Sequence, residues 1–504
     1  MKCSPILVIA AGLTLAIAAR SAEIPDRPEK LQFPPLKYEP PTPDDYRVQL
    51  KSGPVAYIMP DHERPLVNLT IYIRTGTYLE PAGKEGLAEL TGWLLAHGGA
   101  GTNSAEQLEE RLAFLAANLG TYVGDTEGTV SLNLLSKDTD EGFALLHDVL
   151  FAPRFQDDKI TLRKSQMLQS MKQRNDDSSD IEGREAGFLS RGEKFFENRY
   201  ATSNSLASIT PLDLEKFHYA WFWPSNFVVG VSGDFDRKDM IAKLEKLFSG
   251  SPRWLKADLA PVVRPPSAIP TNFTFAASGV YLVNKPEVDQ GRVTMMLPGI
   301  MRDSPDYYAG LVMNSILGGG GFSSRLMGRV RSDEGLAYDV HSRFPGGVYY
   351  PGVISIGFQS KSRTVAYAAS LCVEEMQKIA TAPVTESELN IAKKSFINSF
   401  PQKFATKAAV SAAFASDEFT GRHATDPAFW KNFRDKIQAV TAADVQRVAK
   451  KYLTPDQLVV LVVGNESDIL LGHPNHPVQL KALLGGKFTE LPLRDPLTMQ
   501  PLKP

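Results

Sequence analysis

The sequence predicts an α+β protein of two homologous lobes, each with an antiparallel sheet packed by helices. Three observations support this fold class. The chain has 504 residues, too many for one compact core, and this length favours about two to four domains. Its composition, 43% hydrophobic and 22% charged, is typical of a globular protein. Strand-like and helix-like stretches recur in the same order in both halves.

Residues 1–22 match the pattern of a secretory signal peptide. Lys2 precedes an apolar stretch from Ile6 to Ala19, and small residues suited to cleavage follow. The stretch is too short to span a membrane, and no later segment offers the run of about eighteen apolar residues that a span needs. We therefore expect a periplasmic or secreted protein. Residues 23–45 are rich in proline and are expected to form an extended connector.

Residues 46–251 are expected to form the first lobe, which begins with strands. The pair Ser52-Gly53 leads into a short apolar run that ends at Pro60. The alternating run Val67–Ile73 then predicts a half-buried strand. Long helices are expected in the middle of the lobe.

The first lobe is expected to end with a helix followed by a buried strand. Thr210 is a predicted helix N-cap, with an aspartate three residues later as in a capping box. The helix stops before Pro224, because the residue preceding a proline disfavours helical backbone. The run Phe227–Val231 predicts a strand that Gly233 closes.

Residues 272–485 repeat this order as a second lobe. A proline-rich linker at residues 252–271 precedes it, and residues 486–504 form a C-terminal tail. The Ser-Gly pair and the proline at the start recur at an offset of 226 residues. At the end, four identities recur at an offset of 231: Thr210 and Thr441, Asp213 and Asp444, Pro224 and Pro455, and Gly233 and Gly464. One offset over four identities indicates an internal duplication.

Charge and cysteine content count against several classes of function. A net charge of -2 provides no global field that would attract nucleic acid or anionic lipid. Cys3 lies in the predicted signal peptide and Cys372 in an apolar helical pattern, so neither a disulfide nor a nucleophilic cysteine is expected. No Gly-Lys-Ser/Thr sequence follows the glycine run at 318–321, which argues against a phosphate-binding loop.

Three stretches resemble a known family. They are GLAEL from Gly86, GFSSRLMGRVRSDEGLAYDV from Gly321, and the WPSN unit from Trp223. Over nearly the whole mature chain the sequence resembles the pitrilysin/insulinase family of zinc peptidases, the inverzincins. The resemblance implies two lobes that close like a clamshell over an unfolded peptide. Short-chain bacterial members, like the mitochondrial processing peptidases they resemble, pair two such chains, so this chain would form half of the clamshell.

The zinc motif of this family is degenerate here. Active members carry H-x-x-E-H, in which two histidines hold zinc and the glutamate is the general base. The resemblance places Glu89 and Trp93 at the histidine positions and Gly92 at the glutamate. Trp93 has no lone pair for a metal, and Gly92 cannot accept a proton. The distal glutamate ligand falls near Ser170, where neither Gln169 nor Ser170 replaces it.

The eight histidines offer no substitute zinc site. Only His473 and His476 are close enough in sequence to cooperate, and their proline-flanked stretch is typical of a surface loop. His147 and His218 fall on predicted helix faces among apolar neighbours, where structural histidines are usual. We therefore expect no metal, no cofactor and no catalytic residue in this chain, and zinc in a partner subunit.

A second family motif is retained. The resemblance implies that Arg331 and Tyr338, seven residues apart, reach the substrate carbonyl near the zinc. Arginine is a permanently charged donor, and a tyrosine hydroxyl donates to an oxygen that becomes negative in the transition state. The simpler interpretation is that Arg331 caps or pairs on the surface with Asp333 or Glu334 and that Tyr338 is a core strand residue.

The glycine run before Phe322 is the other retained feature. Gly319, Gly320 and Gly321 are expected to let a peptide backbone approach closely, because the family has a related loop near the substrate. As a bare motif, however, a glycine run is more often a flexible turn.

Three functions remain open on these observations. The first is a non-catalytic subunit of a periplasmic insulinase-family zinc metallopeptidase, in a heterodimer with a homologous zinc-binding chain. The second is a peptide-binding or scaffold protein of the same fold without peptidase activity. The third is an active peptidase with rearranged zinc ligands. The retained spacing of Arg331 and Tyr338 favours the first, because a pure scaffold has no chemical need for that pair.

Overall fold

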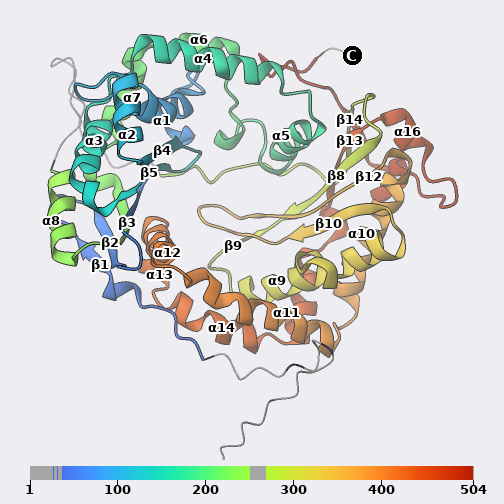
Figure 1. Cartoon of the computed structure of the whole chain (residues 1–504). Coiled ribbons are helices and arrows are strands. Elements are labelled where there is room, and N and C mark those ends of the chain that lie inside the picture. The colour runs from blue at the N-terminus through green and yellow to red at the C-terminus, as the bar shows by residue number, and fades with distance from the viewer. Residues whose placement is uncertain (1–26, 28–30, 32–36, 250–267, 503–504) are drawn as a thin grey trace, which may run out of the picture. The chain divides into compact units, whose positions relative to one another are not determined.

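The computed structural model describes Arg27, Leu31 and residues 37–249 and 268–502 (Figure 1). The predicted signal peptide at residues 1–22, and most of the predicted connector and inter-lobe linker, lie outside the described residues. Within the described ranges, no helix has both the length and the hydropathy needed to cross a bilayer.

The first half contains a six-stranded sheet in the order β1-β2-β6-β3-β5-β4. Its strands are β1 Arg47–Gln49, β2 Val55–Pro60, β3 Leu66–Ile73, β4 Asn118–Val123, β5 Gly128–Leu135 and β6 Phe227–Gly233. Neighbouring strands are antiparallel except β2 and β6. That pair is parallel because the whole lobe intervenes between the two strands and supplies the long crossover connection. The predicted strand at Val67–Ile73 is confirmed, with alternating buried residues.

Eight helices belong to the described part of the first half. They are α1 Leu87–His97, α2 Ala105–Phe114, α3 Thr139–Phe151, α4 Asp157–Lys172, α5 Ser178–Arg191, α6 Ser203–Ser208, α7 Pro211–Trp221 and α8 Arg237–Leu247. The predicted cap of α7 is confirmed, because Thr210 and Asp213 form a reciprocal capping box. His218 of this helix is buried and its Nε2 lies 2.9 Å from the carbonyl oxygen of Leu150, as expected of a structural histidine.

The second half contains a matching sheet in the order β10-β12-β8-β13-β7-β14. Its strands are β7 Gly279–Asn284, β8 Gln290–Pro298, β10 Ala337–Arg343, β12 Val353–Lys361, β13 Val459–Gly464 and β14 Phe488–Leu491. Short strands β9 Ile300–Met301 and β11 Gly346–Gly347 pair separately. The two main sheets differ at one edge, since β1 lies antiparallel to β2 whereas β14 lies parallel to β7.

The helices of the second half complete the repeat. They are α9 Tyr307–Asn314, α10 Val365–Thr381, α11 Glu386–Ser399, α12 Lys407–Phe419, α13 Arg422–Thr425, α14 Phe429–Ala439, α15 Ala442–Tyr452 and α16 Glu466–Leu471. Helix α15 repeats α7 at the predicted offset of 231, including the capping box of Thr441 and Asp444. Cys372 is buried in α10, as its apolar pattern predicts.

The offset at the start of the halves differs from the sequence match. Val55 of β2 lies opposite Val228, and Gly279 of β7 lies opposite Val459. Because Val228 and Val459 are equivalent, the structural offset is 224 residues, and the Ser-Gly match at 226 is two residues out of register. Buried strand residues fix the register of a sheet, whereas turn residues tolerate different spacing.

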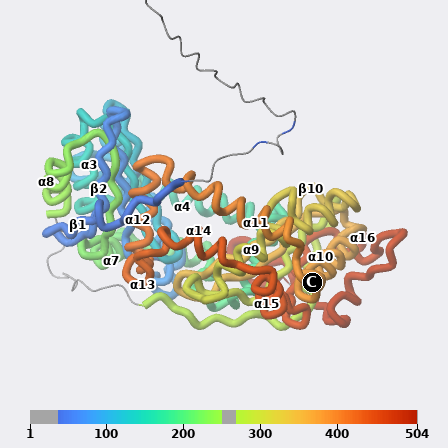
Figure 2. The backbone as a smooth tube through the Cα atoms, turned by 90° about the horizontal axis from the view of Figure 1, so that it is seen from below, coloured from blue at the N-terminus to red at the C-terminus, as the bar shows by residue number. Residues whose placement is uncertain are grey.

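One helix from each half packs on the sheet of the other half. Helix α5 packs on β8 and β13 (Figure 1), and α12 packs on β2 and β6, with α12 beside β2 in Figure 2. Ile181 of α5 joins Val459 in one buried apolar cluster. The hydroxyl of Tyr57 in β2 donates to Glu418 of α12 at 2.9 Å. The halves are therefore interlocked rather than merely linked, which the sequence pattern does not reveal.

The C-terminal tail also connects the two halves. After β14, the Nε of Arg494 donates to the buried Glu185 of α5 at 3.3 Å. Leu497 packs against the hydrophobic core of the first half, and its carbonyl accepts from the backbone N–H of Ser203 at 2.8 Å. The tail is thus anchored beside α4 and α6, close to the pocket described next.

Candidate functional site

The degenerate zinc positions lie in a pocket of about 440 Å³ between α1 and α4. Glu89 and Trp93 of α1 and Ser170 of α4 all line it, whereas Gln169 does not. The structure therefore brings together the helix positions and the distal position that the resemblance relates to zinc. Helix α1 starts after Gly86, whose φ of +99° suits glycine.

Arg163 of α4 fills the space between the two former ligand positions. Its Nη2 lies 2.9 Å from Oε1 of Glu89, and its Cζ lies 5.4 Å from the centroid of the Trp93 ring. The Trp93 ring also stacks on His97, with ring centroids 4.4 Å apart. A permanent positive charge thus occupies a place where a metal ion would require electron-pair donors.

Gly92 does not face the pocket but lies buried against β4. A Cβ atom at this position would lie 2.5 Å from the backbone nitrogen of Val123 and 3.0 Å from the carbonyl carbon of Tyr122. The hydroxyl of Thr121 donates to the Gly92 carbonyl at 2.6 Å and holds the strand close. A glutamate cannot be accommodated at position 92 unless α1 and β4 move apart.

The residues of this pocket do not fit the zinc that the family implies. Within the described parts of the chain, no group of three His, Cys, Asp or Glu side chains is placed to hold a metal ion. Glu80, a buried carboxylate that lines this pocket, accepts the backbone N–H groups of Gly86 at 3.1 Å and Ala88 at 2.7 Å, at the start of α1. Burial raises the pKa of Glu80 to about 7. Glu80 is therefore committed to the helix, and no catalytic step through zinc follows from this chain.

Arg331 and Tyr338 lie together on a second pocket, of about 780 Å³, over strands β8, β10 and β12. The Cζ atom of Arg331 lies 4.8 Å from the Tyr338 ring centroid and 4.7 Å from that of Phe322. Tyr338 is 84% exposed and Phe322 is 77% exposed. The guanidinium is therefore held by two exposed rings and has no ion pair among the described residues.

Both parts of the simpler interpretation are wrong. Glu334 pairs with Arg329 at 2.6 Å rather than with Arg331. Asp333 is exposed, and no ion pair joins it to Arg331. Tyr338, with most of its surface in contact with solvent, is not a core strand residue.

Two backbone irregularities place this pair. Arg331 lies in a π-helical turn, Met327–Asp333, a rare conformation that is frequent at functional sites. The pairing of β10 with β12 shifts register between Ala337 and Val340, so Tyr338 lies in a β-bulge. The bulge leaves two consecutive exposed residues and turns Tyr338 outward, where regular alternation would expose only one.

The glycine run does not line this pocket. Added Cβ atoms would lie 2.3 Å from the Asn314 side chain at Gly319 and 2.4 Å from the Ser315 carbonyl at Gly320. Gly321 has a φ of +64° and open space around it. Tight packing accounts for Gly319 and Gly320, and a substrate-binding role for the run stays a prediction.

Sequence reasoning missed Arg163 and Phe322. The signal for Phe322 is its position directly after the glycine run, where a large apolar side chain in a turn is unusual. Arg163 has no signal in sequence, because its contacts with Glu89 and Trp93 join two helices far apart in the chain.

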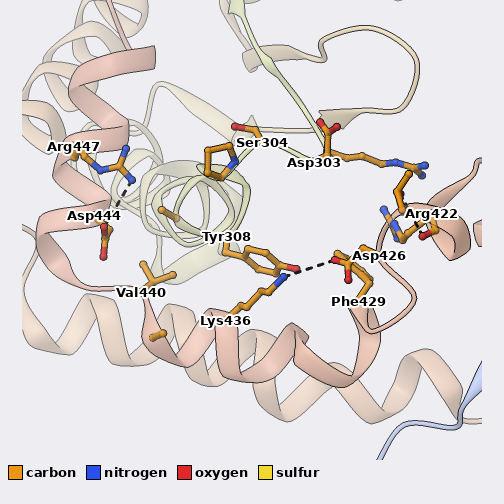
Figure 3. Close-up of a pocket in the computed structure, with 15 residues that line it drawn as sticks. Asp303, Ser304, Tyr308, Arg422, Asp426, Phe429, Lys436, Val440, Asp444 and Arg447 are labelled. Atoms are coloured by element: carbon orange, nitrogen blue, oxygen red, sulfur yellow. Dashed lines mark hydrogen bonds and ion pairs between the residues drawn. The ribbon is translucent and has the colours of Figure 1, made fainter.

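A third pocket, of about 650 Å³, lies between α9, α14 and α15 (Figure 3). Its basic side chains are already engaged. Lys436 lies 3.7 Å from Asp426, Arg447 lies 2.6 Å from Asp306, and Arg422 lies 3.2 Å from Asp417. Burial opposes ionisation of Asp306, but hydrogen bonds from Lys451, Arg447 and Tyr452 outweigh it and lower its pKa to about 2. We assign no binding role to this pocket.

Two family models match the sequence. The one described as Insulinase (Peptidase family M16) matches residues 56–184, which contain the degenerate motif. The one described as Peptidase M16 inactive domain matches residues 208–396, which contain Arg331 and Tyr338.

Two curated proteins illustrate the relatives. An uncharacterized zinc protease of Rickettsia bellii is 21% identical over 431 residues, covering 83% of this chain and 97% of that protein. A protein of Helicobacter pylori named non-peptidase homolog YmxG is 26% identical over 353 residues, covering 68% of this chain and 76% of that protein.

Two solved structures have a similar fold. The peptidase M16 inactive domain from Pseudomonas fluorescens has a TM-score of 0.72 and 23% identity, covering 83% of this chain and 97% of that chain. The periplasmic protease PqqL from Escherichia coli has a TM-score of 0.68 and 16% identity, covering 92% of this chain and 49% of that chain. At these identities the likeness shows the fold alone.

Proposed function

The chain belongs to the insulinase (M16) family of peptidases, and on that premise we propose that it is the non-catalytic subunit of a periplasmic zinc metallopeptidase. A homologous partner chain carries the zinc motif, and this chain contributes Arg331, Tyr338 and half of the peptide chamber. The observation that carries the proposal is a contrast between two sites. At the zinc positions Arg163 lies against both Glu89 and Trp93, whereas Tyr338 is exposed and the half-buried Arg331 has no ion pair among the described residues.

The two retained side chains suit the stabilisation of a developing oxyanion. Arg331 keeps its charge at any working pH, and its donors are not used by another side chain of the described structure. The Tyr338 hydroxyl provides a neutral donor from a strand edge. The partner's zinc supplies the activated water when bound. Arg331 and Tyr338 of this chain bind and orient the peptide and donate hydrogen bonds to its carbonyl oxygen.

Pairing and export are supported by one structural neighbour. This chain matches about half of PqqL, which is called a periplasmic protease, and it also matches the separately solved first half of that protein at a TM-score of 0.69. The chain therefore corresponds to one half of a longer protein, which supports a second chain of similar size as its partner.

A second candidate function is peptide binding or scaffolding without any peptidase partner. The name of the Helicobacter pylori relative, non-peptidase homolog, favours it. The two proposals differ in whether a zinc-binding chain accompanies this one.

The proposal is tested by variants of the retained pair in the assembled complex. Arg331→Ala and Tyr338→Phe should leave assembly intact and lower turnover of an unstructured peptide by roughly a hundredfold each, since one such donor contributes about 3 kcal/mol. Arg343→Ala is the matched control, because Arg343 is exposed on the same strand outside the pocket. Unchanged turnover in both pocket variants would refute the subunit proposal.

A further inference from the structure

The pocket of Arg331 and Tyr338 has an unbalanced set of charges. Its two carboxylates are both committed to neighbours. Glu182 of α5 accepts from Thr294 at 2.6 Å and pairs with Arg292 at 3.4 Å, and Asp339 lies 2.8 Å from Nδ1 of His341. The arginine and lysine side chains that line the pocket, Arg292, Arg331 and Lys361, therefore outnumber its two carboxylates by one.

Two cations of the same pocket have no anionic partner in the described structure. They are Arg331 and Lys361, the last residue of β12. Lys361 is exposed, and no hydrogen bond or ion pair of its ammonium group is formed with a described residue. Two unpaired cations at one concave site attract an anion, and the attraction is stronger there than on a flat surface.

The two rings around Arg331 restrict how it can bind. Phe322 and Tyr338 lie 4.7 Å and 4.8 Å from its Cζ atom and occupy space around the guanidinium. Its N–H donors remain available at the edge of the group. Two parallel donors at that edge match the two oxygens of a carboxylate, which is the geometry that distinguishes arginine from lysine.

We propose that this pocket also recognises a carboxylate group of a bound peptide, with Lys361 and one edge of the Arg331 guanidinium as the anion-binding pair and Phe322 as the residue that positions Arg331. The remaining Arg331 donors stay available for the peptide carbonyl oxygen. The proposal deepens the proposed function, on which it rests for the peptide nature of the ligand. It assigns a substrate class, acidic peptides, and leaves two sources for the carboxylate: an acidic side chain or the peptide's C-terminus.

The test measures affinity on the isolated mature chain by fluorescence anisotropy with three labelled unstructured peptides. One contains glutamates and is amidated at its C-terminus, the second has glutamines instead, and the third is the glutamine peptide with a free carboxylate. The first or the third should bind at least about tenfold more tightly than the second, with a difference that shrinks as salt increases. The first peptide reports acidic side chains, and the third reports the C-terminus.

Variants test whether this pocket causes the preference for peptides that carry a carboxylate. Arg331→Gln and Lys361→Gln should each reduce it, and the double variant should abolish it, whereas Arg343→Gln should retain it. Phe322→Ala should weaken the binding of the preferred peptide about two- to fivefold, as expected for the loss of one exposed cation–π contact. Phe322→Tyr should restore the affinity. Phe114→Ala removes a similarly exposed ring, 86% accessible, from the first half and should change nothing.

The outcomes separate this inference from the subunit proposal. Equal binding of all three peptides, absence of any binding, or a preference that survives in the Arg331→Gln, Lys361→Gln double variant would overturn carboxylate recognition. None of these results depends on a partner chain, whose presence is measured independently by mass spectrometry of the assembly.

Discussion

The contact between α1 and β4 at Gly92 is sensitive to a single methyl group. Gly92→Ala would place a Cβ atom 2.5 Å from the Val123 nitrogen, where ordinary van der Waals contact begins near 3.4 Å. Both nearest atoms are backbone atoms, so no side chain can rotate away. The helix must shift from the strand by roughly 1 Å, which also weakens the bond from Thr121 to the Gly92 carbonyl.

The expected cost follows from three contributions. Overpacking of this kind costs about 1–3 kcal/mol. A weakened buried hydrogen bond adds about 1 kcal/mol. The higher helix propensity of alanine offsets about 1 kcal/mol of this cost. Gly92→Ala should therefore lower the free energy of unfolding by about 2 kcal/mol.

Urea unfolding followed by circular dichroism measures this change. Gly183→Ala is a matched control, because Gly183 also lies inside a helix, α5, and an added Cβ atom there meets nothing within 4 Å. It should raise the free energy of unfolding by about 0.5–1 kcal/mol. If Gly92→Ala is as stable as Gly183→Ala, the close approach of β4 to α1 is not what excludes a side chain from position 92.

Three further predictions concern the zinc positions, Glu80 and the C-terminal tail. The triple variant Glu89→His, Gly92→Glu, Trp93→His should bind no zinc by elemental analysis, because Ser170 provides no third ligand and position 92 has no room; stoichiometric zinc would refute this. The pKa of Glu80 is raised in the fold, so its contribution to stability is full below about pH 4.5 and is lost as pH rises towards about 7. Glu80→Gln should remove that loss and gain up to roughly 3 kcal/mol relative to wild type between pH 5 and pH 8 in urea unfolding; parallel pH profiles would contradict it. Arg494→Ala leaves Glu185, with a side chain only 4% exposed, paired with Arg184 alone, and should cost about 2 kcal/mol, whereas the exposed Arg343→Ala should cost nothing measurable.

The sequence was sufficient for features that depend on local chemistry. The capping boxes of Thr210 and Thr441 use residues three apart, so their helix starts and the offset of 231 could be predicted. The alternation over Val67–Ile73 reports one buried sheet face directly. Regular elements leave such periodic signals because each turn or pleat repeats the same environment.

Features that depend on distant contacts could not be predicted. The exchange of α5 and α12 between the sheets changes no local pattern, since each helix keeps an apolar face whichever sheet it covers. The bulge at Tyr338 breaks the alternation that would otherwise be used to assign burial. Glycine at position 92 has a low helix propensity, and only the close approach of β4 explains why glycine is found there.

The central claim, that this chain is the zinc-free half of a zinc peptidase, is tested most directly by native mass spectrometry of the tagged mature protein purified from its own host. One spectrum reports the mass of any partner and of any metal. The account predicts a one-to-one complex with a second chain of similar size, with one zinc ion that remains on that second chain after dissociation. Zinc retained by this chain, or a zinc-free monomer or homodimer without a partner, would contradict it.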